Sequence, residues 1–239
     1  MKALILAAGL GTRLAPITDD RPKALVPVNG KPILIKQIEN LLENGISDIT
    51  VISGYKAEIM DEMVHARWSE IHVVESVDYA TTNNMYSAYL GVKAMYPDGN
   101  IGGFLMMNAD VFYDASVIRA LLDDAAPNAI VVDMGRYIEE SMKVVEKDSR
   151  LVAIAKTITP EEALGSSIDV YKFDAAGAQA FYRRCAEYIE ERGELKKWSE
   201  VALNDALGDV IFRACPLCGR WLEIDNHEDL AAAEALFAE

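Results

Sequence analysis

The chain has 239 residues, of which 51% are apolar and 26% are charged, so it can bury a sizeable core and keep a polar surface. Its 38 acidic residues outnumber its 23 basic ones, and the net charge of −15 argues against binding nucleic acid or an anionic membrane through the overall field. No apolar run approaches the roughly 20 residues that cross a bilayer, and the three cysteines make no disulfide framework. We therefore expect a cytoplasmic protein that meets any phosphate at a local site.

Strand and helix signals alternate through the first half of the chain. Residues 2–7 form an apolar run that ends at Gly9 and Gly11, which is typical of a buried parallel strand and too short for a signal peptide. The elements predicted after it are, in chain order, helix 32–44, strand 48–53, helix 56–67, strand 71–75, helix 83–95, strand 103–107, helix 116–124 and strand 129–133. This alternation predicts an α/β fold of the Rossmann-like kind, a three-layer α/β/α sandwich around a mostly parallel central sheet.

The pattern changes after residue 133. The elements predicted there are short strands 142–146, 151–156 and 168–173 in a meander, helices 175–192 and 199–207, strand 210–214 and helix 228–237. Because the sequence contains no repeat, low-complexity tract or linker, we expect a single domain over 1–239. Its nucleotide-binding half would be 1–133, and its acceptor-binding half, with the small β-meander, 134–239.

The loop after the first predicted strand has the composition of a phosphate site. Glycines at Gly9 and Gly11 allow backbone N–H groups to converge on phosphate oxygens, and Arg13 and Lys23 supply positive charge. The spacing matches neither the P-loop nor the dinucleotide-binding fingerprint. A tight strand–helix turn is the alternative interpretation of the two glycines alone.

Two aspartates far apart in the sequence each follow a strand-like run. Asp110 ends the apolar segment before it, and Asp225 comes just after Glu223 and before the last predicted helix. Ligands of open α/β sheets gather at the carboxyl ends of strands, and Mg²⁺ prefers carboxylate and phosphate oxygens. We therefore predict Asp110 and Asp225 as ligands of Mg²⁺, with Glu223 as a further ligand or supporting acid. A helix cap is the alternative role for Asp110.

The segments 9–18 (GLGTRLAPIT) and 21–28 (RPKALVPV) together resemble the signature of the sugar-phosphate nucleotidyltransferase superfamily. The resemblance implies a GT-A-like nucleotidyltransferase fold and a loop that holds a nucleoside triphosphate. It assigns the triphosphate to Arg13 and Lys23, also the expected catalytic residues, and to the backbone around them. The nucleotide-binding residues in this loop are Leu6, Ala7, Ala8, Gly9, Gly11, Thr12, Arg13 and Lys23.

The reaction implied is nucleotidyl transfer. A phosphate oxygen of the acceptor attacks the α-phosphorus of the triphosphate, and pyrophosphate leaves. Positioning and charge neutralisation by Mg²⁺, Arg13 and Lys23 supply most of the rate enhancement. Asp110 contacts the nucleotide through the metal in this scheme.

The segment 79–87 (YATTNNMYS) suggests which nucleotide is used. It resembles a segment of the choline-phosphate and aminophosphonate cytidylyltransferase-like members, which favours CTP, with Asn83, Asn84 and Ser87 near the base or ribose. Simple capping of the helix predicted over 83–95 is the alternative role of the two asparagines.

Candidate acceptor-binding residues lie in the second half. Lys156 and Lys143 are candidates for the acceptor phosphate, and Trp198 and Glu200 fall where relatives carry acceptor-side aromatics and acids. Relatives have glycine at the position of Asp169, and an acid there favours a cationic head group, although it can also accept from hydroxyls. Trp198 can face a quaternary ammonium through a cation–π contact or serve only in packing.

The leading hypothesis is a Mg²⁺-dependent cytidylyltransferase that acts on a small phosphorylated acceptor, phosphocholine-like first, or on a phosphonate or polyol phosphate. The alternatives are a sugar-1-phosphate uridylyl-, thymidylyl- or guanylyltransferase and a non-catalytic nucleotide-binding regulatory module. The partners expected are the nucleoside triphosphate and the acceptor, without nucleic acid or membrane, in a monomer or homodimer.

Overall fold

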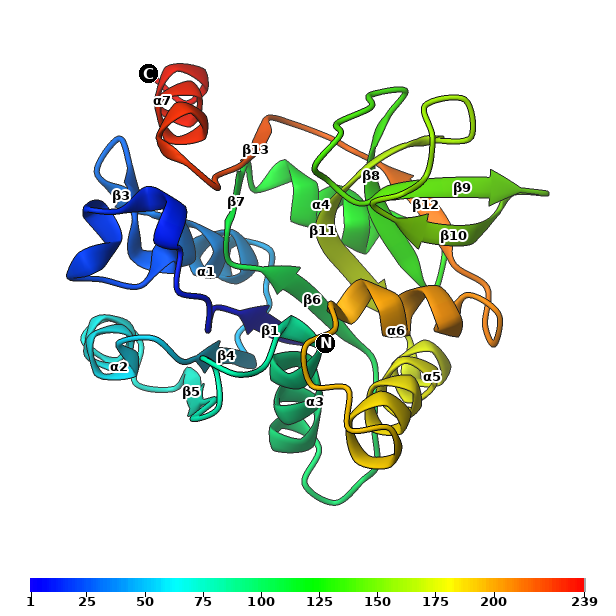
Figure 1. Cartoon of the computed structure of the whole chain (residues 1–239), viewed down its shortest axis with the longest axis horizontal. Helices are drawn as coiled ribbons and strands as arrows, with labels where there is room; N and C mark the ends of the chain where they lie inside the picture. Colours follow the sequence, from blue (N-terminus) through cyan, green and yellow to red (C-terminus); the bar gives the residue numbers. More distant parts are fainter. Residues whose placement is uncertain (239) are drawn as a thin grey trace.

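The computed structural model describes residues 1–238 and has the predicted α/β architecture (Figure 1). A nine-stranded sheet has the path β10-β9-β11-β6-β1-β4-β5, and β8 and β12 continue it beside β11. Four neighbouring strands, β6 (Phe104–Asn108), β1 (Lys2–Leu6), β4 (Ile49–Ser53) and β5 (His72–Glu75), are parallel. The prediction of a mostly parallel central sheet between two helical layers is confirmed.

Helices cover both faces of the sheet because each has one apolar stripe. On one face pack α1 (Ile33–Glu43), α2 (Ala57–His65) and α4 (Ser116–Asp123). On the other face pack α3 (Asn84–Met95), α5 (Ala175–Ala186) and α6 (Ser199–Ala206) (Figure 1). The last helix, α7 (His227–Leu236), lies against the short strand β2 (Pro27–Val28), which pairs with β3 (Lys31–Pro32).

The second half adds antiparallel strands to the sheet. β9 (Lys143–Lys147) and β10 (Arg150–Ala155) form a hairpin at one edge, and the long β11 (Gly165–Phe173) pairs antiparallel with β9, β6 and β8 (Ala129–Met134). The hairpin turn uses positive φ angles at Asp148 and Ser149, as a two-residue turn requires. The predicted meander is thus present, and it joins the central sheet.

One predicted element is wrong in extent, and one has the predicted extent but changes helix type. The strand expected at 210–214 is β12 (Arg213–Pro216), which pairs with β8 only from Arg213 onward. The apolar run before it is not a strand. Phe212 instead buries its ring against Phe173, in the core between the sheet and the helices α3, α5 and α6. The helix expected over 175–192 ends as an α-helix at Ala186 and continues as a π-helical turn over Glu187–Glu191.

The connections place loops from both halves at one edge of the sheet. Leu6 and Asn108 are register partners at the carboxyl ends of β1 and β6, so the loop after each strand begins at the same level. β7 (Val111–Tyr113) pairs antiparallel with β13 (Trp221–Glu223), and the N–H of Ile224 donates to the carbonyl of Asp110 at 2.8 Å. This pairing brings residues near 225 beside residues near 110.

Within residues 1–238, none of the helices has both the length and the apolar character needed to cross a membrane.

Candidate active site

A cleft of about 270 Å³ opens at the carboxyl ends of β1 and β6. Most of the residues predicted for the site line it: Leu6, Ala7, Ala8, Gly9, Arg13, Lys23, Asn83, Asn84, Ser87, Asp110, Lys156, Asp169, Trp198, Glu200 and Asp225. Gly11, Thr12 and Lys143 are not among the lining residues. The fold thus gathers both predicted groups, nucleotide and acceptor, around one space.

Gly11 lies just outside the cleft and shapes it through Lys23. Its φ of 65° is in the left-handed region, and a Cβ there would stand 2.6 Å from the Cβ of Lys23. The hydroxyl of Thr18 donates to the Gly11 carbonyl at 2.9 Å and holds the turn, and Thr12 begins the single 3₁₀ turn that carries Arg13. Glycine at this position therefore lets Lys23 lie close to the loop.

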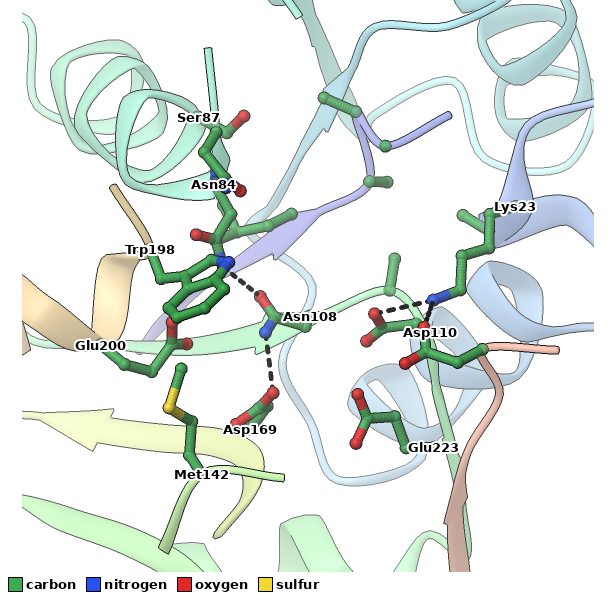
Figure 2. Close-up of a pocket in the computed structure, with 18 of the residues that line it drawn as sticks. Lys23, Asn84, Ser87, Asn108, Asp110, Met142, Asp169, Trp198, Glu200 and Glu223 are labelled. Atoms are coloured by element: carbon green, nitrogen blue, oxygen red, sulfur yellow. Dashed lines mark hydrogen bonds and ion pairs between the residues drawn. The ribbon is translucent and has the colours of Figure 1, made fainter. Parts of the chain in front are cut away.

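The four charged side chains predicted to act together do meet. The ammonium of Lys23 lies 3.0 Å from Asp110 Oδ2 and 2.6 Å from Asp225 Oδ1, and the guanidinium of Arg13 lies 2.9 Å from Asp225 Oδ2. Figure 2 shows Lys23 pointing at Asp110, with Glu223 below them. Residues separated by more than 200 positions in the chain thus form one charged cluster.

Opposite charges in the cluster offset the effect of burial on the pKa values of Lys23 and Asp225. Burial alone would lower the pKa of Lys23, but the carboxylates of Asp110 and Asp225 outweigh it, and the pKa of Lys23 is raised. Burial would likewise raise the pKa of Asp225, yet Lys23 and then Arg13 hold that pKa below its usual range. Each charge is therefore retained by its opposite neighbours.

The acids of this cluster fit a divalent metal ion. Asp110, Glu223 and Asp225 each offer an oxygen within 4.8 Å of the others, and Asp110 Oδ1 is buried without a hydrogen-bond partner among the described residues. Hard divalent cations take such carboxylate oxygens. Burial, with Asp110 and then Asp225 nearby, raises the pKa of Glu223 to about 7, so an added positive charge would relieve a crowded acidic site.

Helix α1 holds the backbone on both sides of Asp110. The side-chain amide of Gln37, which is fully buried, donates to the carbonyl of Asn108 at 2.9 Å and to that of Val111 at 2.8 Å. One turn further along, the amide of Asn40 donates to the carbonyl of Tyr113 at 2.8 Å. The sequence did not single out either residue, because both occupy positions that are typical of the polar side of an amphipathic helix.

The asparagines at the start of α3 differ in what they do. Asn83 caps the helix, since its side-chain oxygen accepts from the N–H of Asn84 at 2.8 Å. Asn84 contacts the neighbouring helix α6 and strand β6: its oxygen accepts from the N–H of Ser199 at 2.9 Å, and its nitrogen lies 3.5 Å from Asn108 Oδ1. Ser87 follows one turn later on the same wall (Figure 2).

Asn108 is a site residue that the sequence analysis did not select. Its amide nitrogen donates to Asp169 Oδ2 at 3.0 Å, so it links the α3 side of the cleft to β11 (Figure 2). The available signal was its position at the end of β6, two residues before Asp110. The other unselected residues that line the cleft are Ala24, Tyr79, Thr82, Ala109, Glu140, Ser141 and Met142. Glu223, predicted as a further metal ligand or supporting acid, lines it too.

The candidate acceptor lysines lie in different surroundings. Lys156 lines the cleft, and its ammonium lies 5.1 Å from the ring centroid of Trp198, which is 45% exposed. Lys143 is fully buried, donates to the carbonyl of Glu139 at 2.7 Å, and lies over the ring of Tyr137. Burial, with the charge of Lys156, lowers the pKa of Lys143. Of the two lysines, Lys156 is the one that a ligand in the cleft could contact.

Comparisons with known proteins place this geometry in a family. The model of a family described as nucleotidyl transferase matches residues 2–156. The choline-phosphate cytidylyltransferase of Streptococcus pneumoniae is 52% identical over 90 residues, which cover 38% of each chain. The UTP–glucose-1-phosphate uridylyltransferase AglF of Haloferax volcanii is 33% identical over 67% of this chain and 72% of its own.

A solved structure of the CTP:phosphocholine cytidylyltransferase of Streptococcus pneumoniae superposes with a TM-score of 0.78 at 27% identity, covering 98% of this chain and 97% of the other. The chain spans 38% to 54% of the length of the first three curated relatives that it matches. These matches confirm the resemblance to the nucleotidyltransferase superfamily that the N-terminal motif indicates, and to its cytidylyltransferase-like members that the segment 79–87 indicates. Because the family model covers more than half of its residues, the chain belongs to the nucleotidyl transferase family.

Proposed function

We propose that this nucleotidyltransferase transfers CMP from CTP, with Mg²⁺, to a small phosphorylated acceptor that bears a cationic head group, phosphocholine being the first candidate. The observation that carries the proposal is the meeting of Arg13, Lys23, Asp110 and Asp225 at one edge of the sheet. Cationic groups for a triphosphate and carboxylates for its metal are thereby within reach of the same phosphates.

The residues have distinct roles in this proposal. The glycine loop and Arg13 would bind the triphosphate, while Lys23 would neutralise charge at the α-phosphorus as the acceptor oxygen attacks. The new bond joins the acceptor phosphate oxygen to the α-phosphorus, the bond from that phosphorus to the bridging oxygen breaks, and pyrophosphate leaves. Asp110 and Asp225, with Glu223, would hold Mg²⁺, which supplies charge neutralisation on the phosphates when bound.

The acceptor end of the cleft supports a cationic head group. Asp169 and Glu200 bring carboxyl groups to the cleft, and Trp198 presents an exposed aromatic face beside them. An aromatic face and acids together attract alkylammonium groups. The likeness to a choline-phosphate cytidylyltransferase supports CTP and a choline-type acceptor.

A pyrophosphate-release assay tests the proposal. CTP, UTP, GTP, dTTP and ATP are each combined with phosphocholine, inositol 1-phosphate and glucose 1-phosphate in the presence of Mg²⁺. We expect CTP with phosphocholine to give the highest kcat/KM. Faster turnover of any other nucleotide than of CTP would overturn the base assignment.

Two variants separate catalysis from nucleotide binding without catalysis. Asp110→Asn and Asp225→Asn should each abolish turnover while the protein stays folded, because each removes a charged metal ligand. Asp123→Asn, at the exposed end of α4, is the matched control and should retain activity. Unchanged turnover in both active-site variants would reject the metal assignment, and a wild type without turnover would favour a regulatory nucleotide-binding module.

The second candidate is a sugar-1-phosphate uridylyltransferase. The 33% identity to a UTP–glucose-1-phosphate uridylyltransferase over two thirds of the chain favours it. In the same assay this candidate predicts the highest kcat/KM for UTP with glucose 1-phosphate.

A further inference from the structure

Strand β11 departs from regular geometry at Asp169, on the floor of the cleft. Its φ of 57° is in the left-handed region that favours glycine, and the pairing with β8 shifts register between Ser167 and Tyr171. The hydroxyl oxygen of Ser167 accepts from the N–H of Asp169 at 3.1 Å, and Asn108 donates to the Asp169 carboxyl group. A non-glycine residue held in this conformation at a ligand site points to a function for its side chain.

The Asp169 carboxyl group shares a hydroxyl group with a second acid. The phenol oxygen of Tyr171 lies 2.8 Å from Asp169 Oδ1 and 3.0 Å from Glu200 Oε1, and Ser199 donates to the same Glu200 oxygen at 3.0 Å. Tyr171 is fully buried and Glu200 is 2% exposed. The three groups therefore depend on one another for hydrogen bonds at this position.

The phenol of Tyr171 has fewer protons than the two carboxyl oxygens that it contacts. A phenol has a single proton to donate, so Tyr171 can satisfy one of the two carboxyl oxygens. Glu200 Oε1 accepts from Ser199, yet it also lies 3.0 Å from the phenol oxygen. A further proton on one of the two carboxyl groups would make both phenol contacts hydrogen bonds. The cluster of Asp169, Tyr171 and Glu200 thus has a hydrogen-bonding position for one proton more than two carboxylates and a neutral phenol carry.

The charges around the cluster favour keeping that proton. Burial raises the pKa of Asp169 well above its usual value, and Glu200, Glu223 and Asp110 add to the effect. The lysine on the same rim, Lys156, lies over the ring of Trp198. Proton retention is therefore the response of a buried acidic site that has no ligand to balance it.

We propose that the ammonium group of the acceptor exchanges with this proton. On binding, the positive charge would lie beside Asp169 and Glu200, and the proton would pass from their shared hydrogen bond to the solvent. An acceptor of the same shape without positive charge would leave the proton in place. The inference rests on the proposed cytidylyl transfer and deepens it, because it makes Asp169 a determinant of acceptor specificity.

Titration calorimetry of the whole protein tests the exchange directly. Phosphocholine and 3,3-dimethylbutyl phosphate, in which a tert-butyl group replaces the trimethylammonium, are compared with Mg²⁺ and a non-hydrolysable CTP analogue present. Buffers of different ionisation enthalpy report the protons released. We expect phosphocholine to release about one proton more than its neutral isostere, and its Kd to fall by up to about tenfold per pH unit relative to the isostere.

Three variants assign the proton to the cluster. Asp169→Asn should abolish the extra proton release and lower kcat/KM for phosphocholine at least about tenfold, with little change for the isostere. Tyr171→Phe keeps the buried ring but removes the hydroxyl that lowers the pKa of Asp169, so the extra release should persist to higher pH than in the wild type, and it serves if Asp169→Asn fails to fold. Ser149→Gly, at the same φ of 57° but in the exposed hairpin turn, is the control and should change neither readout.

Equal proton release for the two acceptors, or an Asp169→Asn variant that still releases the extra proton, would overturn the inference. These results are distinct from failure of the proposed function. Transfer of CMP to both acceptors with equal proton release would refute only the exchange, whereas absence of pyrophosphate release from CTP with every acceptor would refute the cytidylyl transfer itself.

Discussion

The ammonium of Lys23 lies between two carboxylates, and replacing it by methionine tests how far the site depends on this charge. Methionine has nearly the same length and no charge, so Lys23→Met removes the two contacts at 3.0 and 2.6 Å without opening a large cavity. Asp110 and Asp225 would then face one another without a cation between them. The remaining cation, Arg13, contacts the other carboxyl oxygen of Asp225, Oδ2.

The size of the effect follows from the distances and the burial. At an effective dielectric constant of about 20, each ion contact is worth roughly 5.5–6.5 kcal/mol before desolvation is counted. The side chains of Lys23, Asp110 and Asp225 are 13%, 27% and 19% exposed, so solvent screening lowers the net value. We expect the free energy of unfolding to fall by about 2–4 kcal/mol, slightly less than for a fully buried pair.

The pH dependence has a definite sign. In the wild type the folded-state pKa of Asp225 is depressed, so its contribution is present above the unfolded pKa near 3.8 and is lost only as pH falls through the lower folded value. In Lys23→Met the carboxylates repel one another, so protonation relieves the folded state. The stability difference between the two proteins should therefore be largest near neutral pH and shrink below about pH 5.

Urea unfolding of ligand-free wild type and variant across this pH range measures the difference. Lys31→Met is the matched control, because Lys31 pairs with Glu39 at 2.8 Å with side chains 45% and 41% exposed, and exposed pairs are worth at most about 1 kcal/mol. Added Mg²⁺ should restore part of the stability of Lys23→Met by binding the freed acids. A loss no larger than that of Lys31→Met, or one that does not change with pH, would refute the reasoning.

Three other perturbations follow from the same contacts. The folded-state pKa of Glu223 is raised to about 7, so ionisation of Glu223 destabilises the ligand-free fold increasingly from the unfolded pKa near 4.5 up to pH 7. Glu223→Gln should therefore raise the melting temperature above pH 7. An unchanged melting temperature would contradict this prediction. Gln37→Met should lower kcat about 10–100-fold and weaken the response to Mg²⁺, since a small displacement of the segment around Asp110 disturbs the reacting geometry. Asn40→Leu, on the next turn of α1, is its control and should leave the Mg²⁺ response intact. Trp198→Ala should raise the KM for phosphocholine about 3–30-fold with a smaller effect on the KM for CTP, and equal effects on both would argue for a packing role.

The parallel half of the fold could be predicted from local patterns. Buried strands such as β1 and β4 are continuous apolar runs, and α1 and α3 begin and end where apolar spacing and capping residues indicate. The strand predicted at 210–214 lies at Arg213–Pro216 instead. Phe212 is an apolar residue that packs against Phe173 and does not belong to the paired strand. Short-range pattern does not distinguish these two reasons for burial.

The N-terminal motif by itself indicated the family and predicted a triphosphate loop with Arg13 and Lys23, because such a loop needs glycines and cationic residues at fixed spacing. Only the tertiary structure decided that Lys143 is buried away from the cleft, that Gln37 holds the segment around Asp110, and that Tyr171 joins Asp169 to Glu200. These relations depend on strand register and side-chain direction between elements distant in sequence. Such contacts leave no periodicity in the chain, since each one follows from where folding places two unrelated segments.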